Sequence, residues 1–204
     1  MIDPVILLAY IPAAVALNLT PGADMMFCLG QGLRGGPRAA MAANLGIGLG
    51  SLVHVLIAGL GLGALVAAHP GLFDAIRWIG VAYLLFLAWK SLRASALPEV
   101  PRVSPRRAFR EGLMVNLTNP KVILFVLAFI PQFVDPARAI LPQFLIFGAI
   151  IGLGGLVVNG AVGLAAGGAA GRLMRSARFA AWLGRVSAAI FAGLALRLAL
   201  IQRG

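Results

Sequence analysis

Two ionisable side chains of opposite charge stand beside prolines in otherwise apolar stretches of this chain. Asp24 closes the sequence NLTPGAD (18–24), and Lys121 closes NLTNPK (116–121). A charge at bilayer depth costs at least about 2.5 kcal/mol on insertion scales, so such residues are functional candidates. Asp24 could carry a coupling proton or hold an ammonium group, and Lys121 could hold a carboxylate. Alternatively, the two could form a buried pair that only holds the protein together.

The prolines in these two stretches predict broken helices. A proline removes one helical donor and displaces the carbonyl four residues earlier, so Pro21 frees that of Leu17 and Pro120 frees that of Asn116. Gly22 adds a position where the backbone can bend. A break also exposes the N–H groups of a new helix N-terminus, which favour an anion such as a carboxylate. One such break could be a packing kink, whereas two similar ones favour a binding site.

The composition of the chain places these breaks in a membrane protein. Of the 204 residues, 61% are hydrophobic and only 11% are charged, and the mean hydropathy is +0.97. A soluble domain of this length needs more charged surface, and one membrane span needs roughly 20 apolar residues. Charges, prolines and polar turns divide the chain into six predicted spans: Pro4–Leu29, Arg38–Ala68, Leu72–Leu92, Ala108–Phe133, Ala139–Ala170 and Ala177–Leu200.

The placement of the basic residues predicts the orientation. The net charge is +11, and if the loops alternate between two sides, 11 Lys and Arg fall on one side and 4 on the other. Cytoplasmic loops are enriched in Lys and Arg, so both termini are predicted to lie outside the cytoplasm. The basic run Arg102–Arg110 is then a cytoplasmic loop beside anionic lipid, not a nucleic-acid site. Because MIDPVILL lacks a basic n-region, the first span is expected to be retained.

The remaining polar residues suggest few other kinds of chemistry. His54 could relay protons or simply bond to a neighbouring helix, and Asn44 and Asn159 could join helices or line a cavity. Cys28 is the single cysteine, so no intramolecular disulfide forms, and no metal or cofactor site is expected. The aromatic residues Trp78, Tyr83, Trp89 and Trp182 are expected mainly as anchors at the membrane interface.

An internal repeat predicts the architecture. A shift of 98 residues aligns Asn18 with Asn116 and Thr20 with Thr118, and a shift of 104 aligns IGLGSLV (47–53) with IGLGGLV (151–157). Two halves of three spans each, about 1–95 and 104–204 with a linker at 95–107, would enter the membrane from opposite sides. Such inverted repeats are typical of secondary transporters. We therefore expect one all-α transmembrane domain, with six helices in two inverted repeats and helices 1 and 4 broken.

The motifs resemble those of a known family along nearly the whole chain. TPGAD (20–24), GLRGGPRAAMAANLGIGLGSLVH (32–54), GVAYLLFLAWKSLR (80–93), FREGLMVNLTNPK (109–121) and LAFIPQFV (127–134) are similar to the lysine exporter (LysE) superfamily and its RhtB-type exporters of homoserine and threonine. The resemblance implies export of an amino acid or derivative in exchange for protons. The family commonly has a second proline where this chain has Ala23, which predicts a milder break.

These observations predict a secondary exporter of small neutral amino acids in a bacterial inner membrane. Its partners are the substrate, protons and lipid, with a homodimer possible and nucleic acid excluded. The predicted substrate site comprises Asn18, Pro21, Gly22, Asp24, Asn44, Asn116, Asn119, Pro120 and Lys121, and Asp24 and His54 are the candidates for proton coupling.

Three other functions fit the sequence less well than export. A thiol–disulfide electron carrier of the CcdA/DsbD type needs a thiol pair, which Cys28 alone cannot supply. A membrane scaffold leaves the two polar breaks unexplained. An intramembrane hydrolase would have to use Ser51 and His54 with no acid or oxyanion site evident.

Overall fold

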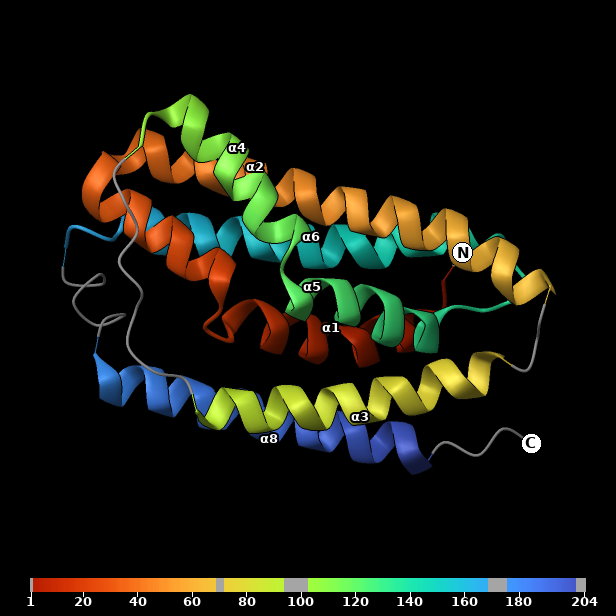
Figure 1. The fold of residues 1–204 in the computed structure, drawn as a ribbon. Helices are drawn as coiled ribbons and strands as arrows, with labels where there is room; N and C mark the ends of the chain where they lie inside the picture. The colour runs from red at the N-terminus through yellow and green to blue at the C-terminus, as the bar shows by residue number, and fades with distance from the viewer. Residues whose placement is uncertain (1, 69–71, 94–102, 169–175, 201–204) are drawn as a thin grey trace.

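The computed structural model describes residues 2–68, 72–93, 103–168 and 176–200. Within these ranges the regular structure is helical and contains no strand. Its helices are α1 Pro4–Leu19, α2 Ala23–Ala68, α3 Leu72–Leu92, α4 Pro105–Leu117, α5 Pro120–Leu124, α6 Ile140–Leu164 and α8 Ala177–Leu200 (Figure 1). A π-helical stretch, η1 Phe125–Phe129, and a 3-10 stretch, η2 Ile130–Phe133, continue α5.

Prolines and short polar side chains set the helix ends near both predicted breaks. Asp3 caps α1, and its side chain accepts a hydrogen bond from Val5 N at 2.8 Å. α1 ends before Thr20 and Pro21, and α4 ends before Thr118. Asn119 then caps α5, with proline in its first turn, where a missing N–H costs nothing.

The helix labelled α2 consists of two helical segments joined at Gly36. Gly36 has φ 76° and ψ −174°, a backbone conformation that glycine adopts readily because it has no Cβ. Pro37 follows and opens the second segment, as proline commonly does at the start of a helix. The chain therefore reverses direction here, which is visible where the two parts of α2 meet in Figure 1.

The helices form a bundle in which the broken segments lie between two groups. α2 packs mainly against α4 and α6, and α3 packs along α8 (Figure 1). α1 contacts α6 and α8, while α5 and η1 contact α3. An aromatic cluster fills the core beside α1, where Tyr10 packs against Phe125, Phe129 and Phe147. The two breaks are thus held inside the bundle by helices on both sides.

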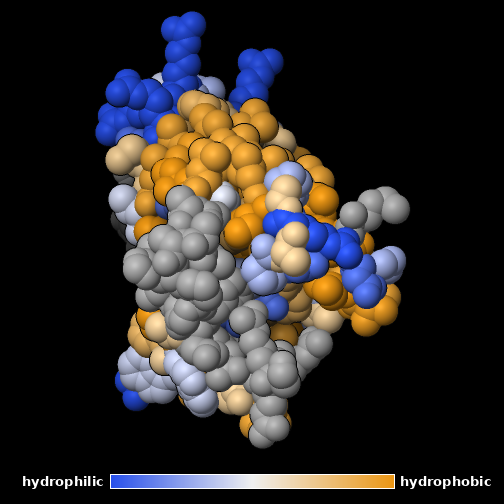
Figure 2. All heavy atoms as spheres, turned by 90° about the vertical axis from the view of Figure 1, so that its right-hand side faces the viewer, coloured by the Kyte–Doolittle hydropathy of each residue, from blue (hydrophilic) through white to orange (hydrophobic). Residues whose placement is uncertain are grey.

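The length and composition of several helices suit a membrane. Three described helices are long and apolar enough to cross one, namely Ala23–Gly61, Ile140–Leu164 and Ala177–Leu196, and the pair Pro105–Leu117 and Pro120–Phe133, bent by 48°, makes a fourth. α1 and the apolar part of α3, Trp78–Leu92, are shorter. Figure 2, which looks onto one end of the bundle, shows apolar side chains over a large part of the surface.

The observed boundaries agree with some predicted spans and correct others. α3 and α8 have the predicted bounds. The first predicted span, Pro4–Leu29, is wrong in extent, because the helix breaks after Leu19 and then continues to the turn at Gly36. The fifth ends at Leu164 rather than Ala170, because a turn begins there. Most of the linker lies outside the described residues, and its end is already helical from Pro105.

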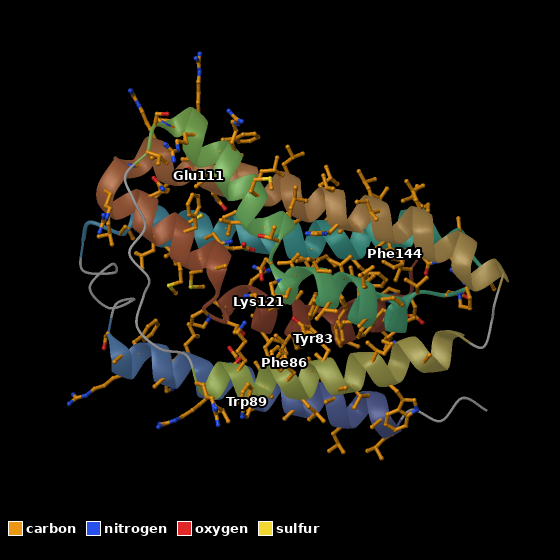
Figure 3. All side chains as sticks on the ribbon, viewed as in Figure 1. Tyr83, Phe86, Trp89, Glu111, Lys121 and Phe144 are labelled. Atoms are coloured by element: carbon orange, nitrogen blue, oxygen red, sulfur yellow. The ribbon has the colours of Figure 1, made fainter. Side chains whose placement is uncertain are left out.

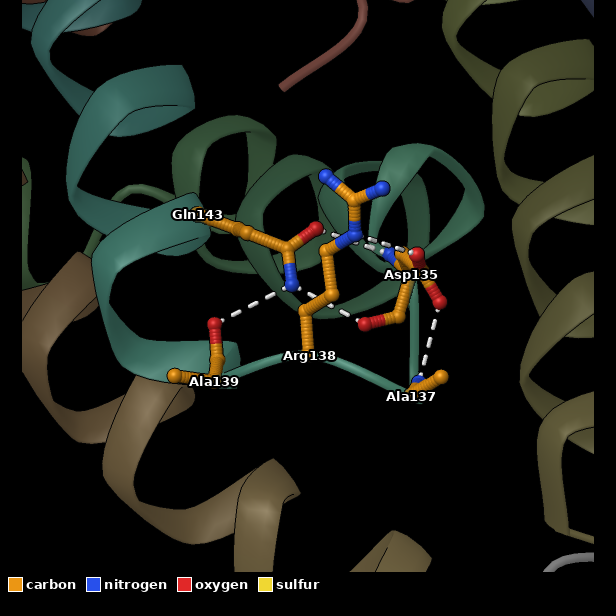
Figure 4. A network of polar contacts seen from close by, with 5 residues as sticks. All are labelled: Asp135, Ala137, Arg138, Ala139 and Gln143. Atoms are coloured by element: carbon orange, nitrogen blue, oxygen red, sulfur yellow. Dashed lines mark hydrogen bonds and ion pairs between the residues drawn. The ribbon is translucent and has the colours of Figure 1, made fainter. Parts of the chain in front are cut away.

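A compact polar network fixes the loop between η2 and α6 (Figure 4). Asp135 N donates to Gln143 Oε1 at 2.8 Å, and Gln143 Nε2 donates to the carbonyl oxygens of Asp135 and Ala139 at 2.9 and 3.1 Å. Arg138 Nε lies 3.0 Å from Asp135 Oδ2. The loop therefore has defined hydrogen-bond partners at this end of the bundle.

Candidate functional site

The first break is closed by a side chain from the second. Lys121, the second residue of α5, donates from Nζ to the carbonyl oxygens of Leu17 and Thr20, each at 2.9 Å. Leu17 is the residue whose carbonyl Pro21 frees, so the ammonium group replaces a missing helical donor. Figure 3 shows Lys121 near the middle of the bundle. The two broken helices are therefore joined through one cation.

The second break has different partners. The carbonyl oxygen of Asn116 lies 3.1 Å from His54 Nε2 and accepts from Asn119 N at 2.9 Å. Because a carbonyl only accepts, His54 donates from Nε2. Tyr83 on α3 donates from its hydroxyl to the carbonyl oxygen of Pro120 at 3.0 Å. Tyr83 is therefore buried against the break and does not act as the interface anchor that we predicted.

Asp24 is held next to the second break by an asparagine. Its Oδ2 accepts from Asn116 Nδ2 at 2.9 Å, and Asp24 is only 7% exposed. The other carboxylate oxygen, Oδ1, is buried without a hydrogen-bond partner, as is Asn116 Oδ1. A buried acceptor without a donor is costly. This pair therefore has capacity for a proton or for a ligand that donates hydrogen bonds.

Asp24 and Lys121 do not form the ion pair that the sequence left open. Their charged atoms do not come within 4.0 Å of each other, the distance expected of an ion pair. Arg107–Glu111 and Arg138–Asp135 are ion pairs in the described part of the chain. Lys121 is bound to carbonyl groups and Asp24 to an amide instead. Both charged groups thus remain available to a zwitterion, which carries one group complementary to each.

Asp24 and Lys121 do line a common central cavity. It lies between α1, α2, α5 and α6, and its polar lining comes from Asn18, Asp24, Ser51, Lys121 and Asn159. Its volume is about 20 Å³, which is room for about one water molecule. The conformation described here is therefore closed around this cavity, and a substrate would require the helices to move apart.

A second cavity also borders Lys121, and we call it the break cavity. It includes Pro21 and Gly22 from the first break, Asn119 and Pro120 from the second, and Lys121 again. Its volume is about 120 Å³. Seven of the nine residues predicted to form one site therefore line two cavities, and Lys121 borders both.

Two predicted asparagines attach helices to α6. Asn18 Nδ2 donates to the carbonyl oxygen of Ile151 at 3.2 Å, and Asn44 Nδ2 donates to that of Leu156 at 2.8 Å. Asn18 also borders the central cavity, whereas Asn44 and Asn116 border neither cavity. Asn44 therefore joins two helices, which is one of the two roles that the sequence left open, the other being to line a cavity.

Sequence reasoning missed several residues at these cavities. Ser51 borders the central cavity, and Lys90 and Ser91 on α3 border the break cavity. Ser51 lies in the repeated IGLGSLV motif, and this repeat could have indicated Ser51 as a site residue. No pattern in the sequence distinguishes Lys90 from the basic residues of a loop. His54, the other residue of the hydrolase alternative, contacts the carbonyl oxygen of Asn116 through Nε2. Cys28 is a buried free thiol.

The part of the chain that contains both breaks matches a known family. The chain matches the LysE type translocator family over residues 15–202, which is most of its length. The chain belongs to the LysE type translocator family. It is therefore a multi-pass membrane translocator. Its family is one of transporters and not of enzymes.

Individual relatives of this LysE type translocator extend over much of the chain. An uncharacterized membrane protein of Vibrio cholerae is 35% identical over 197 residues, covering 94% of this chain and 95% of its own. The homoserine/homoserine lactone efflux protein of Salmonella typhimurium is 35% identical over 144 residues, covering 69% and 70%. An uncharacterized membrane protein of Bacillus subtilis is 34% identical, covering 72% and 76%. No solved structure matches the chain.

Proposed function

We propose that this translocator exports small neutral amino acids, such as homoserine or threonine, or their derivatives across the inner membrane. The observation that carries the proposal is the central cavity, where a carboxylate and an ammonium group, Asp24 and Lys121, meet without pairing. A zwitterionic substrate presents the complementary pair of charges. The relatives named as homoserine/homoserine lactone efflux proteins support the same substrate class.

The substrate binds between the two broken helices. The backbone and side chains around Pro21 and Pro120 hold its carboxylate, and Asp24 takes its ammonium group or the coupling proton. Two features support this assignment, namely the unpartnered Oδ1 of Asp24 and the position of the cavities beside both breaks. Intramembrane carboxylates commonly serve in proton relays, so export by proton antiport follows from the same residue.

We place the chain in the membrane as six spans in two inverted repeats, with both termini outside. Two observations support this topology. Both predicted breaks occur at repeat-related positions, after Leu19 and after Leu117. The repeat-related threonines make the same bond, since Thr20 Oγ1 donates to Ala16 O at 2.5 Å and Thr118 Oγ1 to Met114 O at 2.8 Å. Alternating access then comes from rocking one repeat against the other.

The test is transport of labelled L-homoserine into inverted membrane vesicles that contain the purified chain. With an imposed proton gradient, wild-type vesicles should accumulate homoserine and empty vesicles should not. Asp24→Asn keeps the acceptor for the Asn116 amide but removes the ionisable group, so it should abolish gradient-driven accumulation while the protein still folds. Gradient-driven accumulation equal to wild type in Asp24→Asn would refute the role of Asp24. Absence of transport of a full amino-acid panel by the wild-type protein would refute the function.

A further inference from the structure

The break cavity carries positive charge from two helices. Lys90, in the last turn of α3, and Lys121, on α5, both border it, and no Asp or Glu is among its lining residues. The cavity also includes Ala23, the first residue of α2. The first backbone N–H groups of a helix have no carbonyl partner within the helix, because no helical turn precedes them. Helix N-termini attract anions for this reason. The cavity therefore favours a negatively charged group.

An unpartnered donor in the same cavity points to a ligand. Asn119 is 4% exposed, and its Nδ2 is buried with no hydrogen-bond partner. The orientation of this amide is set by its other end, because Asn119 Oδ1 accepts from Lys121 N at 3.0 Å. The amide group facing away from that bond can therefore only donate. A buried donor of this kind requires an acceptor, and a carboxylate oxygen is a strong one.

From these contacts we infer that the break cavity is a carboxylate-binding subsite, separate from the central cavity, in which Asn119, Lys90 and Lys121 bind the substrate carboxylate. The inference rests on the proposed export of amino acids and adds Lys90 and Asn119 Nδ2 as specificity determinants. With a volume of about 120 Å³ against about 20 Å³ for the central cavity, it is the larger of the two in this conformation. In the proposed topology it lies on the cytoplasmic side, where substrate arrives.

The position of Lys121 gives the subsite a role in the transport cycle. Lys121, whose Nζ atom binds the carbonyl oxygens of Leu17 and Thr20, borders both cavities. A carboxylate in the break cavity competes with those two carbonyl groups for the ammonium group. Binding there therefore weakens the contact that closes the first break, which links substrate capture to opening of the central cavity.

Two substrates that differ in the carboxylate test this subsite. L-Homoserine carries a free carboxylate, and L-homoserine lactone does not. In inverted vesicles, Lys90→Gln and Asn119→Asp should each raise the KM for homoserine about tenfold, because each variant loses one hydrogen bond to the charged carboxylate. The kcat for homoserine and the KM for the lactone should both stay within about twofold of the wild-type values. Asn119→Asp keeps an acceptor for Lys121 N and replaces the unpartnered donor by a negatively charged acceptor, which repels a substrate carboxylate. An equal change for both substrates, or no change for either, would overturn the inference.

A matched control and a direct binding assay separate this inference from the proposed function. Arg93→Gln removes a cation directly after the end of α3, which stacks on Trp89 at 4.2 Å and does not border the cavity, so the KM for homoserine should stay at the wild-type value. In detergent, 4-hydroxybutyrate, which is homoserine without its ammonium group, should raise the thermal unfolding temperature of the wild type but not of Lys90→Gln or Asn119→Asp. No shift in the wild type, or the same shift in all three, overturns the subsite even if transport fails.

Discussion

The ammonium nitrogen of Lys121 lies 2.9 Å from the carbonyl oxygen of Leu17, across 104 residues of sequence. Pro21 leaves this carbonyl without its helical donor, and a lysine from the other broken helix supplies one. A hydrogen bond from a charged donor is worth about 1.5–3 kcal/mol. The contact is therefore strong enough to favour the closed arrangement and weak enough to be exchanged for a substrate.

Replacement of Lys121 by Met should open this contact. Two carbonyl groups lose their charged donor, so we expect the free energy of unfolding to fall by about 1.5–3 kcal/mol and homoserine transport to fall at least about tenfold. Denaturation in detergent and transport in vesicles measure the two effects. Arg107→Gln, which breaks an exposed pair with Glu111, is the control and should change stability by about 0.5 kcal/mol or less. Wild-type stability and transport in Lys121→Met would contradict the role of Lys121.

Gly22→Ala should disturb Lys121 without removing it. A Cβ at position 22 would lie 3.1 Å from Lys121 Nζ and 3.3 Å from Cε, so the flexible side chain must shift away from Leu17 and Thr20. We expect transport to fall several-fold while the protein folds normally. Gly61→Ala is the matched control, because nothing lies within 4 Å of its added Cβ. The control should gain up to about 1 kcal/mol of stability with unchanged transport, and equal transport in both variants would count against the prediction.

Tyr83→Phe should separate stability from transport when it is compared with Tyr10→Phe. Tyr83→Phe removes the hydroxyl that donates to Pro120 O at 3.0 Å, and Tyr10→Phe removes the hydroxyl that donates to Phe147 O at 3.2 Å. Both should lose about 0.5–1.5 kcal/mol of stability, the net value of one hydrogen bond. Because Pro120 lies at a break and Phe147 does not, we expect slower transport in Tyr83→Phe alone. Equal transport rates in the two variants would show that this bond only supports the fold.

Labelling of single cysteines should determine the orientation. Ile2 and Ser104 precede α1 and α4, which begin toward opposite ends of the bundle (Figure 1). In a Cys28→Ser background, a membrane-impermeant maleimide added to intact cells should label a cysteine at position 2 and not one at position 104. Labelling should reverse in inverted vesicles. The opposite pattern would overturn the orientation derived from the basic residues.

The local features of the chain could be predicted because they depend on neighbouring residues. Pro21 and Pro120 each lie just after a helix end, since a proline excludes a donor wherever it stands. The bounds of α3 and α8 agree with the division of the chain at charges, prolines and polar turns. At the first break Thr20, Pro21 and Gly22 are all non-helical, so one proline followed by Gly22 and Ala23 is enough to end the helix; that this break is milder than in the relatives stays a prediction.

The partners across the bundle depend on packing, and only the tertiary structure decided them. The sequence identified Asp24 and Lys121 as the charged groups of a site and left open whether they pair. In the folded chain Asp24 binds Asn116, 92 residues away, and Lys121 binds Leu17 and Thr20. Whether a charged group meets a carbonyl, an amide or another charge depends on how the helices pack and on which freed backbone groups need a donor. The same packing places Lys121 between two cavities, a position that no spacing in the sequence reveals.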